Sequence, residues 1–432
     1  MPQTHTRLIA LLCSLLLPVS AWASLVRWTG KIPGSLQGYG DSAEQLAALT
    51  GDGILIYAHA AQPIQLPTFA STKRGKFYST AVVLPVPSHT VAALLSDYSG
   101  YAQLFPTLKS AKMLEQRQHI SQVKYRIHIP TPIPVLNFKD DVILQHQRTD
   151  NSIETLVIDA PIPYGAGKIE WFALSAHQTL VTVTHWGDLA QPKGFLFRTI
   201  LNALPDAKLG LPAGTNAFIL EALQRKFKST TPRALPAGEV PAPELSASQI
   251  NKIRQISQKS QEPVSFILPA YQVSYGAKQE VMRFSSSYQY YAQPANKLKP
   301  WLEPQAYQHL FPRQIKKVHI QQPSARQLDA NYKISVGLGV IQIPFDFKLR
   351  FQAQGALEQQ FQAVGGDLRY MQGGMQILPQ AEGSLLNVTT AMNIDAQAPF
   401  LLRAMRSMPY HELLPALGGN TVLTLKIQQK IK

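Results

Sequence analysis

The sequence contains an internal repeat of about 205 residues, and this repeat constrains the fold more than any other feature. The segment Tyr101-Ala-Gln-Leu-Phe-Pro matches Tyr307-Gln-His-Leu-Phe-Pro, and further matches follow in the same order along the chain. These are Tyr125–Ile129 with Tyr332–Val336, Leu180–Thr184 with Leu386–Thr390, and Leu211–Gly214 with Leu414–Gly418. Two copies of one fold explain this order, and 432 residues give room for two domains.

A Pro-rich polar stretch separates the two copies. Four prolines between residues 232 and 243 indicate a semi-rigid linker, and Ser246–Ile256 is typical of a short helix capped by Ser246 or Ser248. We therefore expect a signal peptide over residues 1–23, an N-terminal segment of unassigned structure over 24–52, a first domain over 53–228, the linker and short helix over 229–263, and a second domain over 264–432.

Within each copy the hydrophobic pattern has mostly a period of two, which is typical of antiparallel strands with one buried face. Apolar residues alternate with polar ones over 123–129 and again over 345–351, and a Gly337-Leu-Gly339 bend predicts a hairpin between 332–336 and 345–351. Helical spacing appears over Thr90–Leu95, with Ser88 as its expected cap, and over Thr215–Phe227. The pattern predicts an α+β fold with a helix at the end of a sheet.

The N-terminus is typical of a secretory leader. Arg7 precedes an apolar run from Leu8 to Val19, and Ala21-Trp22-Ala23 predicts cleavage before Ser24 and a periplasmic protein. An uncleaved anchor is the alternative. Cleavage would also remove the one cysteine of the sequence, Cys13, which excludes disulfides, thiol catalysis and Cys-ligated metal in the exported protein.

Several segments of the first copy resemble the START-like domains of the SRPBCC superfamily, of the polyketide cyclase and coenzyme Q-binding type. The resemblance begins with Tyr78–Pro106, where a strand, a Pro-rich turn and a short helix lead into the Tyr-Ala-Gln-Leu-Phe-Pro segment. Pro130–Asp141 is similar to the family's proline-containing loop, although the order of Phe138, Lys139 and Asp140 is altered. Gly167–Trp171 and 182–188 are similar to its later strands.

The resemblance implies two helix-grip domains. In each, a curved antiparallel sheet wraps a long C-terminal helix and encloses an apolar tunnel. In the second copy Leu423, Leu425 and Ile427 alternate as in a strand where this fold requires the helix. Asn420-Thr421 would be able to cap a helix there, so two START-like domains remain the prediction.

The tunnel that the resemblance implies suits a lipid, sterol or quinone, and binding or carriage of such a molecule is the predicted function. No cofactor is expected. For each lining residue the alternative is ordinary core packing. The aromatic residues expected to line it are Tyr101, Phe105, Tyr125, Phe138, Trp171, Trp186, Phe197 and Phe218.

Two other classes of function stay open. A cyclase or dehydratase in the same cavity would need an acid or base, for which Asp140, Asp141 and His128 are the candidates. The third class is an envelope scaffold without a ligand. No histidine spacing predicts a metal site, and no nucleophile or phosphate-loop motif occurs, so an enzyme is the weaker hypothesis.

The net charge of +15 raises the question of an anionic partner. No nucleic-acid recognition motif accompanies the charge, and export argues against such a partner. Cations near an apolar helix and the linker are compatible with an anionic membrane surface, although a solvated helix end is the favoured explanation. These cations are Arg225, Lys226, Lys228, Lys252, Arg254 and Lys259.

Overall fold

The protein is described from a computed structural model. The structure describes residues 25–26, 28, 30–69, 71–129, 138–193, 198, 201–202, 205–228, 231–236, 238–275, 277–338 and 341–431. Residues 1–23, for which a signal peptide is predicted and which include Cys13, lie outside these residues. Among the described helices, none is long and apolar enough to cross a membrane.

The first half of the chain folds into one curved sheet with a long helix after its last strand. Its elements are α1 (Ala43–Thr50), β1 (Ile54–Ala58), β2 (Gln62–Ile64), β3 (Lys73–Gly75), β4 (Tyr78–Leu84), α2 (Ser88–Ser96), α3 (Tyr101–Leu104), β5 (Leu108–Arg117), β6 (Ile120–Ile129), β7 (Phe138–Arg148), β8 (Ser152–Asp159), β9 (Gly165–Ser175), β10 (Gln178–Gly187) and α5 (Ala207–Phe227).

The second half repeats this order and begins after a short strand and a helix. Its elements are β11 (Arg233–Ala234), α6 (Ala247–Ser260), β12 (Val264–Tyr275), β13 (Lys278–Tyr291), α7 (Ala295–Leu298), η2 (Lys299–Leu302), α8 (Ala306–Leu310), β14 (Ile315–Ser324), β15 (Gln327–Leu338), β16 (Ile341–Gly355), β17 (Glu358–Gly366), β18 (Tyr370–Pro379), β19 (Ser384–Asn393), α9 (Phe400–Ala404), η3 (Met405–Ser407) and α10 (Leu414–Ile431).

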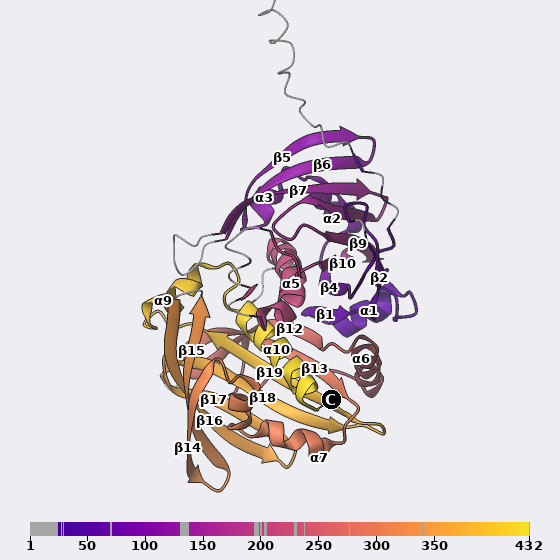
Figure 1. The fold of residues 1–432 in the computed structure, drawn as a ribbon. Helices are drawn as coiled ribbons and strands as arrows, with labels where there is room; N and C mark the ends of the chain where they lie inside the picture. The colour runs from indigo at the N-terminus through magenta and orange to yellow at the C-terminus, as the bar shows by residue number, and fades with distance from the viewer. Residues whose placement is uncertain are drawn as a thin grey trace, which may run out of the picture.

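Strand order is the same in both halves. In the first half β4 pairs with the last strand β10, and β9, β8, β7, β6 and β5 follow antiparallel. In the second half β13 pairs with β19, and β18, β17, β16, β15 and β14 follow. The helices α5 and α10 pack against these sheets near the junction of the halves (Figure 1). The predicted α+β class with two helix-grip domains is confirmed.

One additional strand in each half joins the two sheets. Strand β1 pairs with β4 on one side and with β12 on the other, with Ile54 opposite Ile267. Gly53 precedes this pairing, and a Cβ atom there would lie 2.3 Å from the carbonyl oxygen of Ile267. Within the described residues, seventeen strands consequently belong to one continuous sheet. The sequence did not predict this connection, because the glycine-rich pattern around β1 hides the strand.

The two terminal helices also contact each other. A Cβ atom built on Gly210 of α5 would lie 3.2 Å from the Cα atom of Gly418 in α10, so the absence of a side chain at Gly210 allows a close crossing. A buried ion-pair cluster adds to this interface. Glu221 of α5 is fully buried and accepts two hydrogen bonds from Arg283 of β13, at 2.8 and 3.0 Å. The domains are therefore held together by strand pairing, helix packing and charge.

The N-terminal segment and α6 cover the outer face of the sheet where the domains meet. Leu46 and Leu49 of α1 and Ile253 of α6 are buried in one cluster with Leu55 and Phe266. Elements outside the START-like order thus bury this part of the sheet's outer face. This explains why β1 has no exposed residue although it joins two domains.

Two predicted helix boundaries need correction. Helix α2 begins at Ser88, which is its first residue and not its cap, because Pro87 occupies the N-cap position. Helix α5 begins at Ala207, two turns before the predicted start, and continues through Pro212. Its packing against α10 outweighs the local propensity of proline and glycine to end a helix. The expected Ser246 cap of α6 is confirmed as a capping box with Gln249.

The strand-like alternation near the C-terminus belongs to a helix. Leu423, Leu425 and Ile427 all lie within α10, as the START-like fold requires. Asn420 lies in the middle of this helix and does not cap it. Its amide is instead buried against the sheet, where tertiary hydrogen bonds replace a capping role.

Candidate ligand site

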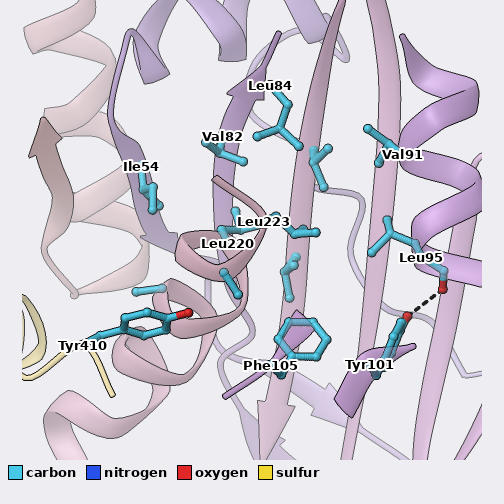
Figure 2. Close-up of a cluster of buried hydrophobic side chains, with 14 of the residues drawn as sticks. Ile54, Val82, Leu84, Val91, Leu95, Tyr101, Phe105, Leu220, Leu223 and Tyr410 are labelled. Carbon is cyan, nitrogen blue, oxygen red and sulfur yellow. Dashed lines mark hydrogen bonds between the residues drawn. The ribbon is translucent and has the colours of Figure 1, made fainter. Parts of the chain in front are cut away.

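The concave face of the first sheet carries the main apolar cluster of the first domain. Side chains from β1, β4, α2, α3 and α5 point into the same interior in Figure 2, and they include Ile54, Val82, Leu84, Val91, Leu95, Leu220 and Leu223. Tyr410, Leu413 and Leu417 of the second domain belong to the same cluster. The interior of the first domain is therefore completed by residues of the second.

Four of the predicted lining residues meet in this interior. Tyr101, Phe105, Tyr125 and Trp171 are all at least nine-tenths buried in one cluster. The ring of Tyr101 lies edge-on to Phe105 at 5.2 Å and stacks on Tyr125 at 6.0 Å. Its hydroxyl donates a hydrogen bond of 2.6 Å to the carbonyl of Leu95 (Figure 2). These aromatic side chains fill much of the space between the sheet and α5.

The other four predicted residues lie elsewhere or are not described. Phe218 of α5 is partly buried against the same cluster and contacts Tyr410, with ring centroids 4.6 Å apart. Trp186 packs with Phe77 in a separate cluster on the outer face of the sheet. Side chains alternate along β10, so Trp186 points away from the face that carries Val183. The side chain of Phe138 and all of Phe197 lie outside the described part of the chain.

A buried histidine that sequence reasoning missed lies beside the tyrosines. His146 of β7 is 4% exposed, and its Nε2 atom lies 2.9 Å from the hydroxyl of Tyr125. Its Nδ1 atom lies 2.9 Å from the Oγ1 atom of Thr155. The ring of Tyr98 stacks on the imidazole at 4.5 Å with an interplanar angle of 15°. The three polar side chains of Tyr125, His146 and Thr155 form a chain inside an apolar interior.

Burial determines the charge of this histidine. Desolvation lowers the pKa of His146 to about 3, because the interior disfavours the imidazolium form. The imidazole is therefore neutral at neutral pH, with one nitrogen as donor and the other as acceptor. Burial also raises the pKa of Tyr125 far above its usual value. The pair can exchange hydrogen bonds with a neutral polar group, but it is poorly suited to proton transfer near pH 7.

The second domain lacks this polar chain. His146 of β7 pairs with Ser121, which is four residues before Tyr125 on β6. In the same way, Phe351 of β16 pairs with Leu328, which is four residues before Tyr332 on β15. The internal repeat aligns Tyr125 with Tyr332. Phe351 therefore occupies the position of His146.

The position of Thr155 also changes from a polar residue in the first domain to an apolar one in the second. Thr155 of β8 lies opposite His146, whereas Phe361 of β17 lies opposite Phe351. The two phenylalanine rings of the second domain contact each other at 5.6 Å. A histidine and a threonine in the first domain thus correspond to two phenylalanines in the second.

Two of the three candidate acids and bases lie on the outer face. Asp141 accepts hydrogen bonds from Arg126 at 2.8 and 3.1 Å and pairs with Lys124 at 2.7 Å. These contacts hold its pKa well below the usual range, with Arg126 the larger cause. His128 shares the face of Arg126 by strand alternation. Asp140 lies on the inner-face register of β7, and its Oδ1 atom accepts the backbone N–H of Asp141.

The cations expected to meet a membrane are mostly engaged within the protein. Arg225 pairs with Glu221 at 2.7 Å and also with Glu412, and Lys228 lies 3.7 Å from a carboxylate oxygen of Asp52. Lys252 donates to the carbonyl of Gly38, while Arg254 bonds to Asn251 and Gln258 of its own helix. These contacts explain the cations without a membrane.

Two polar hollows lie outside the aromatic interior. One, of about 180 Å³, is lined at the domain junction by residues that include Glu221, Arg225 and Arg283. The other, of about 230 Å³, lies over β14 and β15. Neither is lined by a predicted aromatic residue. No group of three or more potential metal ligands occurs among the residues that the structure describes.

Comparison with known proteins gives fold-level likenesses only. No family model matches the sequence, and the search of curated proteins found no match. The di-domain ARO/CYC StfQ of the steffimycin biosynthetic pathway is 12% identical, with a TM-score of 0.25, over 82% of this chain and 99% of its own.

Two single-domain structures match part of the chain. A START superfamily protein from Mycobacterium smegmatis is 19% identical over 35% of this chain and 97% of its own, with a TM-score of 0.28. A STAR-related lipid transfer protein from Xanthomonas axonopodis is 13% identical over 41% of this chain and 96% of its own, with a TM-score of 0.27. Strand order and the two terminal helices carry the assignment: the chain has the fold of a tandem START-like protein.

Proposed function

We propose that the first domain binds a hydrophobic molecule on the concave face of its sheet, and that Tyr125 and His146 contact a polar group of that molecule. The buried polar chain of the first domain carries this proposal. Burial of the His146 imidazole and the Thr155 hydroxyl costs free energy that the two phenylalanines at these positions in the second domain avoid. A neutral donor and acceptor inside an apolar interior is the arrangement that typically orients a ligand.

The aromatic side chains supply the apolar part of the site. Tyr101, Phe105 and Trp171 surround the polar chain, and Phe218 borders it from α5. Because these side chains fill the space, a ligand must displace some of them, and the short helix α3 is the element that carries Tyr101. Each buried methylene contributes about 0.8 kcal/mol, so a chain of roughly ten methylenes would offset the rearrangement.

We further propose that this binding occurs in the periplasm, which the leader-like N-terminus supports, and that the ligand is a lipid, sterol or quinone. Such molecules combine a long apolar part with one or two neutral polar groups, which matches the composition of the interior. An anionic membrane surface remains a proposed partner for ligand exchange. Binding is favoured over cyclase or dehydratase chemistry, because His146 is neutral and Asp141 and His128 face outward.

Replacement of the polar chain by its second-domain counterpart tests the proposal. The variant His146→Phe/Thr155→Phe keeps the interior apolar, and Phe361→Leu in the second domain is the matched control. Lipid extracts of both purified proteins would be compared by mass spectrometry. We expect the double variant to lose the bound molecule and the control to keep it. Retention by a folded double variant would exclude the proposed contact.

A second candidate is a scaffold whose interiors are filled by side chains. The packing of Tyr101, Phe105 and Tyr125 favours it, since these rings contact one another directly. A scaffold predicts that the wild-type protein carries no stoichiometric lipid and takes up none from vesicles. That result would transfer the role of the aromatic residues from ligand binding to core packing.

A further inference from the structure

The outer face of the second sheet carries a cationic hollow that is independent of the proposed ligand site. The hollow of about 230 Å³ is lined by Lys317 and His319 of β14 and by Asn331 and Lys333 of β15. Lys317 lies directly opposite Lys333, and His319 lies directly opposite Asn331. All four side chains therefore share one face, and both lysines are exposed.

The two lysines of this hollow make no ion pair with a described carboxylate, whereas Lys348 and Arg350 on the neighbouring strand do. Lys348 and Arg350 bind Asp329 at 3.1 and 2.8 Å, so that carboxylate is engaged. Asp346 lies opposite Lys333 on β16, but no described carboxylate oxygen approaches Lys317 or Lys333 within 4.0 Å. Like charges directly opposite each other destabilise a sheet. An anion bound between them would relieve this repulsion.

The equivalent surface of the first domain is neutralised internally. Arg126 follows Tyr125 as Lys333 follows Tyr332, and it lies opposite Ser110 instead of a lysine. The adjacent Lys124 does face a lysine on β5, but Asp141 pairs with both Arg126 and Lys124. The same fold thus has a closed charge cluster in one domain and an open one in the other.

We propose that the hollow binds a phosphate-sized anionic group, either free or as the head of a lipid. The two ammonium groups supply charge-assisted hydrogen bonds, and the amide of Asn331 offers two further donors. The Oδ1 atom of Asn331 is buried without a hydrogen-bond partner among the described residues, and it can accept a hydrogen bond from the P–OH group of a monohydrogen phosphate. The volume exceeds the roughly 30 Å³ of one water several-fold, which leaves room for such a group.

Calorimetric titration with inorganic phosphate at low ionic strength tests the site in the full exported chain. We expect Lys317→Ala/Lys333→Ala to weaken binding by about tenfold or more. The control Lys112→Ala/Arg126→Ala removes the same charge from the same strands of the first domain and should bind as the wild type does. If phosphate binding weakens equally in both variants, the effect comes from net charge alone and the proposal is overturned.

Vesicle flotation separates the two sources of the anion. Vesicles of phosphatidylcholine with phosphatidic acid are compared with phosphatidylcholine alone, using the same three proteins. A lipid head is identified if the wild type binds phosphate and floats only with vesicles that contain phosphatidic acid, and if the Lys317→Ala/Lys333→Ala variant loses this flotation. Phosphate binding without flotation identifies a soluble anion. Absence of both, or flotation that the variant keeps, overturns the proposal.

Discussion

Asn216 of α5 and Asn420 of α10 make the same contact in the two domains. The Nδ2 atom of Asn216 donates to the carbonyls of Tyr78 and Val183, on the paired strands β4 and β10. The Nδ2 atom of Asn420 donates to the carbonyls of two residues on β13 and β19, at 2.8 and 3.2 Å. One buried amide thus fixes each terminal helix to the first and last strands of its sheet.

Replacement of either asparagine by alanine should destabilise its domain. The loss of two buried donors removes hydrogen bonds at a fully buried position, and we expect a cost of about 1–3 kcal/mol in the free energy of unfolding. Urea unfolding of Asn216→Ala and Asn420→Ala measures it, with the exposed Asn296→Ala as control. Similar loss in the control and the two variants would show that the amides do not fix the helices.

The crossing of α5 and α10 predicts that substitutions at Gly210 and Gly419 have very different effects on stability. At Gly210 a Cβ atom would lie 3.2 Å from the backbone of Gly418, whereas at Gly419 nothing lies within 4 Å. Gly210→Leu should therefore push α5 and α10 apart and destabilise the protein by about 1–3 kcal/mol. Gly419→Ala should be neutral or stabilise by up to about 1 kcal/mol, because alanine favours the helix. Thermal unfolding of both variants gives the comparison.

The buried ion-pair cluster between the domains predicts a large effect of Glu221. Glu221→Ala leaves Arg283 only 11% exposed and without its carboxylate partner. Removal of one member of a buried pair typically costs about 3–5 kcal/mol. The exposed Glu244→Gln is the control, and the urea midpoint is the measurement. A loss below about 1 kcal/mol would mean that water reaches this cluster and screens it.

Buried histidines predict loss of stability in mild acid. Burial lowers the pKa of His146 to about 3, and of His59 and His185 to about 4. An unfolded histidine titrates near about 6.5, so the unfolded state binds more protons between these values. Stability contributed by the neutral rings is therefore complete above about pH 7 and falls as the pH drops through 6.5 towards 4.

The variant His146→Gln isolates one of these histidines. Its free energy of unfolding should fall by about 2 kcal/mol less than that of the wild type between about pH 7 and pH 5. The exposed His89→Ala is expected to keep the wild-type pH dependence. An unchanged slope in His146→Gln would mean that the imidazole is hydrated and titrates normally.

Much of the fold followed from the sequence because the repeat and the strand alternation are local patterns. The hairpin of β15 and β16, with Tyr332 opposite Phe347, is the one that the period predicted. The start of α5 did not follow, since Pro212 and the glycines of this helix are explained only by its contact with α10. Strand β1 was hidden for a different reason, because the glycines before it gave no clear strand pattern.

The candidate site was predicted in part. Tyr101, Phe105 and Tyr125 lie in one cluster, since the short helix α3 and its C-cap pack against the inner face of β6, whereas their role as a ligand lining stays a prediction. Trp186 does not join them, because the aromatic character of a residue says nothing about the face on which it lies. His146 was missed since it follows Gln145 in a polar end of β7. Alignment of the repeat strand by strand, which pairs His146 with Phe351, is the signal that would have revealed it.

Native mass spectrometry of the purified protein, with identification of what dissociates from it, tests the central claim most directly. The account predicts one lipid, sterol or quinone per chain in the wild type, and none in His146→Phe/Thr155→Phe at unchanged fold. Two molecules per chain, or a protein that stays empty after incubation with such molecules, would contradict a polar-anchored ligand site confined to the first domain.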